Sequence, residues 1–339
     1  MESFNFLLFL AIILVSTKVL GIFSKKVKMP QVVGALVAGV ILGPSVLNLV
    51  QMESDGNFLA YMAEIGVILL MFCAGLETDL SELKANGVAS FIVAMCGVIV
   101  PLAGGFIAYA LYFHVDVSSF HECMKAVFVG TVLTATSVSI TVETLRELGH
   151  LKGKVGSTIL GAAIIDDILG IIVLTIVTSL EDTSVNPAAV FGKIALYFVV
   201  IAVIWFVLAK LKPFLESQDQ LRRTAILALA FCFLMAYVSE KFFGIADITG
   251  AYFAGLMLCS MKSESYVNRR VEIPAYLIFS PVFFASIGMK TNLDGLNGSM
   301  ILFSIILLII AILSKVVGCG LGAKICKCTN KEALRIGVG

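Results

Sequence analysis

The feature that most constrains this chain is a series of long apolar segments separated by short, charged loops. The 339 residues are 59% hydrophobic and only 14% charged. A soluble domain carries roughly 25% charged residues, because its surface faces water. A helix that spans a bilayer needs about 20 apolar residues and bonds all of its backbone internally. The sequence therefore predicts an all-α polytopic membrane protein, with a single transmembrane domain over residues 1–339.

Eleven segments are long and apolar enough to be candidate spans, and the loops between them are too short for a soluble domain. The first segment has no positive charge before it and is too long for a cleavable signal, so we expect it to be a retained helix. The predicted spans are residues 4–23, 30–50, 58–76, 88–113, 122–148, 154–181, 188–213, 221–242, 246–261, 273–289 and 299–323.

Lys and Arg are distributed unequally between the two sets of alternate loops. The loops after the first, third and every further odd-numbered span carry 18 of these residues, and the other loops carry 4. Positive residues stay on the cytoplasmic side of a bilayer. The bias predicts a multi-pass protein of the cytoplasmic membrane, with its N-terminus outside and the C-terminus of this chain in the cytoplasm.

Neither the net charge nor the cysteine and histidine pattern points to a nucleic acid or a bound cofactor. The net charge is +1, and the three histidines are predicted to lie in loops. Cys326 and Cys328 lack the second ligand pair of a zinc site, and most other cysteines lie within apolar segments. We therefore expect no cofactor and no nucleic-acid partner.

Asp166 and Asp167 lie in the middle of the predicted span 154–181. A charge in hydrocarbon costs about 3 kcal/mol or more, so it needs a partner or a function. Lys315, in the last span, is the one deep cation that can pair with one of them. Adjacent helical residues point about 100° apart, so the second carboxylate stays unpaired. A structural ion pair explains one aspartate, and the remaining carboxylate indicates ion binding.

A hydroxyl-rich segment, Thr131 to Thr141, lies at the same depth in the fifth span. Its six hydroxyl side chains compete for backbone groups and loosen a helix. An unwound segment here offers oxygen ligands to a small cation, as broken helices do in transporters. The alternative, hydrogen bonding to neighbouring helices, fits the same residues.

Three further ionisable residues lie nearer the ends of the predicted spans. Glu64 fits a carboxylate at the mouth of a cavity, and it equally fits an interfacial charge that reaches water. Glu143 and Arg146 are interpreted as an ordinary i,i+3 helix pair near the interface.

In these residues and their order, the chain resembles the monovalent cation:proton antiporter-2 family, and in particular sodium/proton antiporters of the NapA and NhaA type. The similar stretches are GALVAGVILGPSVL (36–49), AEIGVILLMFCAGLE (63–77), TATSVSITVETLRELG (134–149), GAAIIDDILGIIVL (161–174), PVFFASIGMKTNL (281–293) and ILSKVVGCGLGAK (312–324). The double aspartate with a downstream lysine is the specific motif, and the resemblance runs through the whole chain.

The resemblance implies a homodimer with thirteen helices per chain, built from inverted repeats, with a dimerisation domain and a mobile core domain. It implies that Asp167 carries the ion and the proton, and that Asp166 is paired with Lys315 in the unloaded state. The broken helix becomes Thr134–Ser139, with Thr136 and Ser137 nearest the ion. Both aspartates become ligands of Na⁺.

The end of the chain departs from this pattern. Residues 331–339 (KEALRIGVG) read as the start of a further helix. Thirteen helices are expected and eleven are found, so the sequence predicts that two helices of the family fold lie beyond Gly339. Family members gated by glutathione carry Gln-Asp in place of Asp-Asp and add a nucleotide-binding domain, and this chain shows neither feature.

These features favour a transporter, with Na⁺ and H⁺ as substrates, over an enzyme. We expect cation and protons to compete for one site, in electrogenic exchange, with K⁺/H⁺ exchange as an alternative. An intramembrane aspartyl protease needs two carboxylates that face each other and share a proton, which neighbours on one helix cannot do. An ion channel favours symmetric rings of carbonyls or charges, which a lysine-neutralised aspartate pair does not provide.

Overall fold

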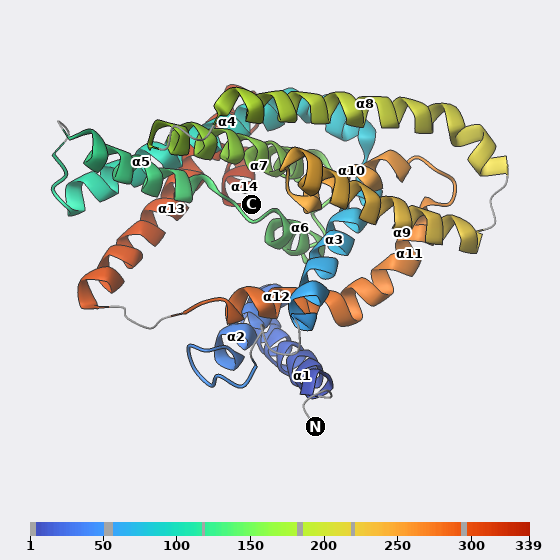
Figure 1. Cartoon of the computed structure of the whole chain (residues 1–339), viewed down its shortest axis with the longest axis horizontal. Helices are drawn as coiled ribbons and strands as arrows, with labels where there is room; N and C mark the ends of the chain where they lie inside the picture. The colour runs from blue at the N-terminus through green and yellow to red at the C-terminus, as the bar shows by residue number, and fades with distance from the viewer. Residues whose placement is uncertain (1–4, 51–56, 117–118, 182–185, 218–220, 293–296) are drawn as a thin grey trace.

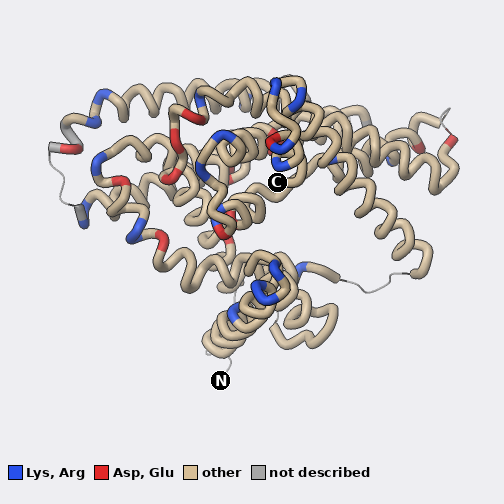
Figure 2. Tube along the Cα trace, turned by 180° about the vertical axis from the view of Figure 1, so that it is seen from behind, with Lys and Arg blue, Asp and Glu red and all other residues tan. Residues whose placement is uncertain are grey.

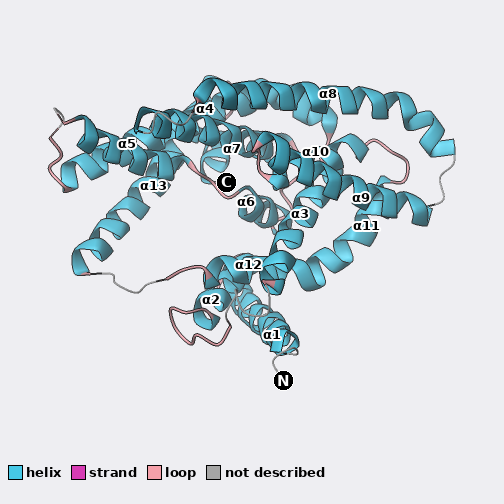
Figure 3. Cartoon of the chain, viewed as in Figure 1, coloured by secondary structure: helices cyan, strands magenta, loops and turns pink. Residues whose placement is uncertain are grey.

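The computed structural model describes residues 5–339 apart from 51–56, 117–118, 182–185, 218–220 and 293–296. The described residues form helices joined by loops and contain no strand (Figure 3). The helices are α1 (Asn5–Lys26), α2 (Gln31–Leu42), α3 (Phe58–Glu77), α4 (Leu80–Tyr112), α5 (Phe120–Thr134), α6 (Val138–Glu147), α7 (Lys154–Glu181), α8 (Pro187–Ser217), α9 (Leu221–Val238), η1 (Ser239–Phe243), α10 (Asp247–Leu258), α11 (Glu264–Pro274), η2 (Ala275–Phe279), α12 (Ser280–Met289), α13 (Gly298–Ile325) and α14 (Asn330–Val338).

Each of the eleven predicted spans contains helix, in the predicted order. Nine helical segments of the described chain are long and apolar enough to cross a membrane. The other two, α2 and α10, have 12 residues each. At 1.5 Å per residue they are about 18 Å long, shorter than the hydrocarbon core of a bilayer. The predictions 30–50 and 246–261 were therefore too long as helices.

The short helix α2 ends where Gly43 and Pro44 stop it. Proline disfavours helical backbone in the residue before it and donates no hydrogen bond. The chain then folds back, and the backbone N–H groups of Leu49 and Val50 donate to the carbonyl of Leu42. Pro281 acts differently, because it follows the wide π-helical turn η2 and starts α12. A π turn of this kind bends a helix without ending it.

Helix α4 starts at a capped turn between two spans. The side chain of Asp79 accepts hydrogen bonds from the Ser81 hydroxyl and from the backbone N–H groups of Ser81 and Glu82. These bonds favour the charged carboxylate and lower the pKa of Asp79 below its ordinary value.

The helices pack as two bundles (Figure 1). The core bundle contains α4, α5, α7, α13 and α14, with α4 packed against α5, α7 and α13. The scaffold bundle contains α1, α2, α3, α9, α10, α11 and α12, with α3 packed against α10, α11 and α12. Helix α8 contacts α7, α10 and η1, and α6 contacts α7 as well as α2 and α3. These two helices therefore connect the bundles.

Charged residues lie mainly at the helix ends, and few lie within the apolar lengths (Figure 2). Leucine, isoleucine, valine and phenylalanine side chains are exposed along the outer faces of α1, α4, α8 and α13. This inverted pattern is what a lipid environment imposes on a helical bundle.

The crossing of α3 and α10 depends on two glycines that bring the backbones together. A Cβ atom on Gly75 would lie 2.3 Å from the carbonyl oxygen of Tyr252, and one on Gly255 would lie 2.2 Å from that of Phe72. Small residues permit this close packing, which replaces the hydrophobic effect as the force between helices in lipid.

We expect Gly255→Ala to destabilise the protein by about 1–3 kcal/mol, because the added methyl group forces the backbones of α3 and α10 apart. The measurement is the midpoint of thermal unfolding in detergent. Gly192→Ala on α8 is the matched control, because a Cβ there meets nothing within 4 Å. Equal unfolding midpoints for the two variants would contradict this account of the crossing.

Candidate functional site

The two aspartates lie at the middle of α7, among apolar neighbours. Asp166 is 6% exposed, and Ala162, Ala163 and Ile164 in the preceding turn are all buried. Asp167 is half-buried. Helix α7 packs against α4 and α5 of the core bundle, so both carboxylates lie inside the protein at mid-membrane depth.

Lys315 on α13 pairs with the first of them. Its Nζ atom lies 3.0 Å from Oδ2 of Asp166, and the two side chains are 20% and 6% exposed. The other oxygen of this carboxylate, Oδ1, is buried and makes no hydrogen bond within the described residues. A carboxylate accepts at both oxygens, so one acceptor position remains open beside the lysine.

Asp167 is the second carboxylate, and it does not share this partner. Among the described residues it makes neither a hydrogen bond nor an ion pair. Its position one residue after Asp166 turns it about 100° away from Lys315. The geometry therefore leaves one paired and one unpaired carboxylate at the same depth.

The span that faces them is broken, which is one of the two alternatives for the hydroxyl-rich segment and the one that the family resemblance implied. Helix α5 ends at Thr134, residues 135–137 are extended, and α6 begins at Val138. Ser137 caps α6, because its hydroxyl accepts a hydrogen bond of 3.4 Å from the Ile140 N–H. The hydroxyl of Thr134 donates to the carbonyl of Thr131 at 2.7 Å. Side-chain bonds of this kind replace the helical ladder where it stops.

A cavity of about 140 Å³ joins three of the predicted residues. Thr136 from the break, Asp166 and Lys315 all line it. The carbonyl end of α5 and the N–H end of α6 meet at this break, and such ends carry partial negative and positive charge. Asp167, Thr134 and Ser137 are not among the described residues that line this cavity. The structure thus brings together Thr136, Asp166 and Lys315, and it leaves the roles of the other three residues as predictions.

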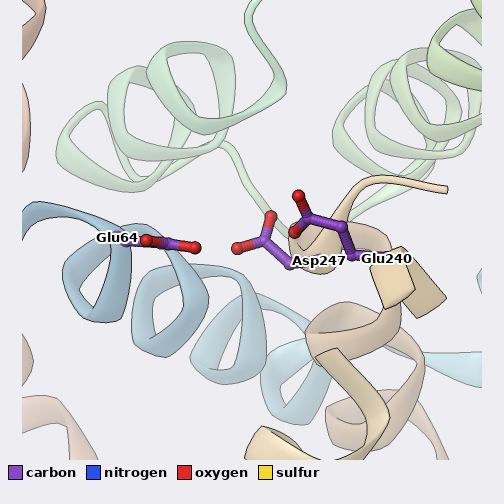
Figure 4. A group of neighbouring side chains, drawn as sticks. All are labelled: Glu64, Glu240 and Asp247. Carbon is purple, nitrogen blue, oxygen red and sulfur yellow. The ribbon is translucent and has the colours of Figure 1, made fainter. Parts of the chain in front are cut away.

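Glu64 belongs to a separate acidic cluster in the scaffold bundle. Carboxylate oxygens of Glu64, Glu240 and Asp247 all lie within 4.8 Å of one another, and the first two residues are exposed. Figure 4 shows Glu64 on α3 and Asp247 at the start of α10 pointing toward one another. Three carboxylates so close together attract cations. The role of Glu64 at a cavity mouth stays a prediction.

The structure corrects the interpretation of Glu143 and Arg146 as a simple helix pair. Arg146 forms ion pairs with Glu77 on α3 and Glu272 on α11. Glu143 is buried and accepts a hydrogen bond of 2.9 Å from the Tyr276 hydroxyl. Each of these partners is 69 residues or more away in the sequence, so the local charge pattern gave no signal for them.

A broken helix beside buried acids, within two connected bundles, is typical of secondary transporters. The family described as "Sodium/hydrogen exchanger, transmembrane" matches residues 10–339. The chain belongs to this family.

Two curated relatives resemble the chain over nearly all of its length. It is 40% identical to "Na(+)/H(+)-K(+) antiporter GerN" of Bacillus cereus, over 99% of this chain and 84% of the relative. It is 36% identical to "Na(+)/H(+) antiporter" of Enterococcus hirae, over 99% of this chain and 86% of that protein.

A solved structure shares the fold. The sodium proton antiporter MjNhaP1 from Methanocaldococcus jannaschii superposes with a TM-score of 0.70 and 20% sequence identity, over 98% of this chain and 82% of that one. The antiporter fold expected from the sequence is thereby confirmed.

We expect Lys315→Met to destabilise the protein by about 3–5 kcal/mol, because it leaves the Asp166 carboxylate buried without its partner. The double variant Lys315→Met with Asp166→Asn removes both charges and should recover most of this loss. Thermal unfolding in detergent measures both, with Lys290→Met at an exposed position as the control. A Lys315→Met variant as stable as the control would contradict the buried ion pair.

Proposed function

We propose that this chain exchanges a monovalent cation, Na⁺ first, for protons at Asp166 and Asp167. The observation that carries the proposal is the unpaired carboxylate of Asp167 at mid-membrane, beside an aspartate that already holds the deep lysine. An unpaired charge at this depth is costly unless a counter-ion binds and leaves. Protons and Na⁺ are the ions that can neutralise it in turn.

Asp167 acts as the main carrier of ion and proton, and Asp166 exchanges its bond to Lys315 for a bond to the cation. The break between α5 and α6 supplies further oxygen ligands, with Thr136 beside Asp166 and with Thr134 and Ser137 at the ends of the two half-helices. Carboxylate, hydroxyl and carbonyl oxygens are the hard ligands that small cations prefer.

Cation and protons compete for this one site. At low pH the carboxylates hold protons and exclude the cation, and at higher pH both are free to bind it. The two aspartates and Lys315 interact strongly and titrate as a coupled set. Two carboxylates that face one cation make the exchange electrogenic, with two protons for each Na⁺.

Exchange requires that the loaded site face each side of the membrane in turn. The core bundle holds Asp166, Asp167 and Lys315, and the scaffold bundle lies against it through α6 and α8. Movement of the core bundle against a fixed scaffold provides alternating access. The transporter acts as a homodimer in the cytoplasmic membrane, with its N-terminus outside, and serves sodium export and pH homeostasis.

K⁺/H⁺ exchange is the second candidate. The relative from Bacillus cereus is described as an Na⁺/H⁺-K⁺ antiporter, and oxygen ligands accept either ion.

We expect Asp167→Asn to abolish exchange, because the amide neither releases a proton nor supplies a negative charge to the cation. Asp166→Asn should retain exchange and lose its dependence on membrane voltage, because one carboxylate then carries one charge in each direction. The measurement is Na⁺-driven proton movement in proteoliposomes with and without an imposed potential. Continued exchange by the Asp167→Asn variant would refute the assignment of the carrier.

The cation preference is tested separately, by the recovery of a quenched pH-sensitive dye in vesicles after addition of Na⁺, Li⁺ or K⁺ at equal concentration. We expect a response to Na⁺ at lower concentration than to K⁺. An equal or stronger response to K⁺ would favour the second candidate. Vesicles without the protein provide the background.

A further inference from the structure

Helix α6 carries a set of interactions that the ion site does not explain. Its first turn adjoins the break that faces Asp166, and its last turn contains Arg146. With 10 residues it is about 15 Å long, and its internal hydrogen bonds make it a rigid helix. Whatever holds its far end therefore also fixes the end that faces the ion.

Within the described residues, the polar contacts of the Arg146 side chain all run to α3, α11 and η2, outside its own helix. Its Nη2 atom lies 2.6 Å from Oε1 of Glu77 and 2.9 Å from Oε1 of Glu272. Its Nη1 atom donates to the Tyr276 hydroxyl, and its guanidinium lies 4.5 Å from the centre of the Tyr276 ring. Asn268 donates to the same Glu77 oxygen at 2.9 Å.

Two further residues on the same face of α6, Glu143 and Glu147, also accept hydrogen bonds from outside their own helix. Glu143 accepts from the Tyr276 hydroxyl at 2.9 Å, and Glu147 accepts from the backbone N–H of Gln31, at the start of α2, at 2.7 Å. Residues 143, 146 and 147 share one helix face because they are three and four positions apart. This face binds α2, α3 and α11 of the scaffold bundle, and η2, which joins α11 to α12.

Arg146 and Glu77 are largely buried, whereas the Glu272 side chain is 41% exposed. The side chains of Arg146 and Glu77 are each 16% exposed. A planar guanidinium that binds two carboxylates is directional, and it loses its energy when the partners separate. In contrast, the ion pairs Lys315–Asp166 and Lys154–Glu332 remain within the core bundle. The contacts of Arg146 therefore oppose separation of the bundles, while these other pairs do not.

A cavity of about 440 Å³ lies beside these contacts. It is lined by residues of α1, α2, α6, η2 and α12, among them Lys18, Gln31, Glu143, Glu147 and Tyr276. These residues lie on the side of the membrane with the Lys- and Arg-rich loops. Glu143 and Glu147 of α6 thus form one wall of a cavity between α6 and the scaffold bundle on that side.

We propose that Arg146, with Glu77 and Glu272, is a latch that holds α6 against the scaffold and opposes separation of the bundles on the Lys- and Arg-rich side. Arg146 is a positioning residue, because it acts through α6 and does not touch the ion. The inference rests on the proposed function. It names the residues that set the equilibrium between the states of the transporter open to the two sides of the membrane.

The first test is hydrogen–deuterium exchange of the amides of residues 138–147 in the intact chain in nanodiscs. Glu77→Gln and Arg146→Gln should each raise the exchange rate of α6 by about tenfold, a typical size for conformational coupling. Lys262→Gln is the control, because it breaks the exposed ion pair to Glu216, in which the lysine is 81% exposed. Exchange in α6 as slow as in the wild type would overturn the latch.

The second test is the sidedness of the apparent KM for Na⁺, measured in inside-out and right-side-out membrane vesicles. Loss of the latch favours the state open to the latch side, so the KM measured from that side should fall and the KM from the other side should rise, each by about tenfold. A merely structural role moves both values in the same direction or neither, and either result would overturn the proposal.

If Arg146→Gln does not fold, Glu77→Gln and Glu272→Gln decide the question, because each removes one carboxylate and leaves the guanidinium one partner. The exchange measurement also separates this inference from the proposed function. If Asp167→Asn still transports while amide exchange of α6 is faster in the latch variants, the assignment of Asp167 as the carrier is wrong and the latch proposal is supported. If Asp167→Asn is inactive and amide exchange of α6 is unchanged in the latch variants, only the latch proposal is refuted.

Discussion

A charge buried in the apolar interior of a membrane protein must be neutralised by an opposite charge. In this chain the ion pair between Lys315 and Asp166 does so. The 3.0 Å ion pair joins α7 to α13 in the middle of the core bundle. It accounts for one aspartate of an adjacent pair and leaves the other one unmatched. Because the two residues are neighbours on one helix, no rotation of α7 pairs both with the same lysine.

The broken span depends on the same constraint. Unpaired backbone groups at mid-membrane depth are tolerated only where they line a cavity or meet protein partners. Thr136, in the middle of the break, satisfies this condition beside Asp166, in a cavity that Lys315 also lines. The local cause is the run of hydroxyl side chains, which bond to nearby backbone groups and take the place of a proline or glycine as the helix breaker.

The two ends of α6 then connect the site to the rest of the molecule. One end adjoins the acids of the core bundle, and the other end is bound by carboxylates of the scaffold bundle. A ten-residue helix between them transmits displacement with little loss, since its backbone hydrogen bonds keep it rigid. On the proposed mechanism, ion binding and the contact between the bundles are coupled through this single helix.

The sequence by itself determined the helical membrane architecture, the order of all eleven spans and the place of Asp166, Asp167 and Lys315 within them. These features follow from local composition and from the free-energy cost of polar groups in lipid. Both act on each segment separately, without any contact to a distant segment. The hydroxyl-rich segment left a broken and an intact helix as alternatives, and the structure shows the break after Thr134. The lengths of α2 and α10 were overestimated, because apolar residues continue past the point where a helix ends. Only the tertiary structure decided that Lys315 takes Asp166 and that Arg146 binds Glu77 and Glu272. Partners from distant segments are chosen by the packing of whole helices, and one-dimensional charge patterns carry no information about that packing.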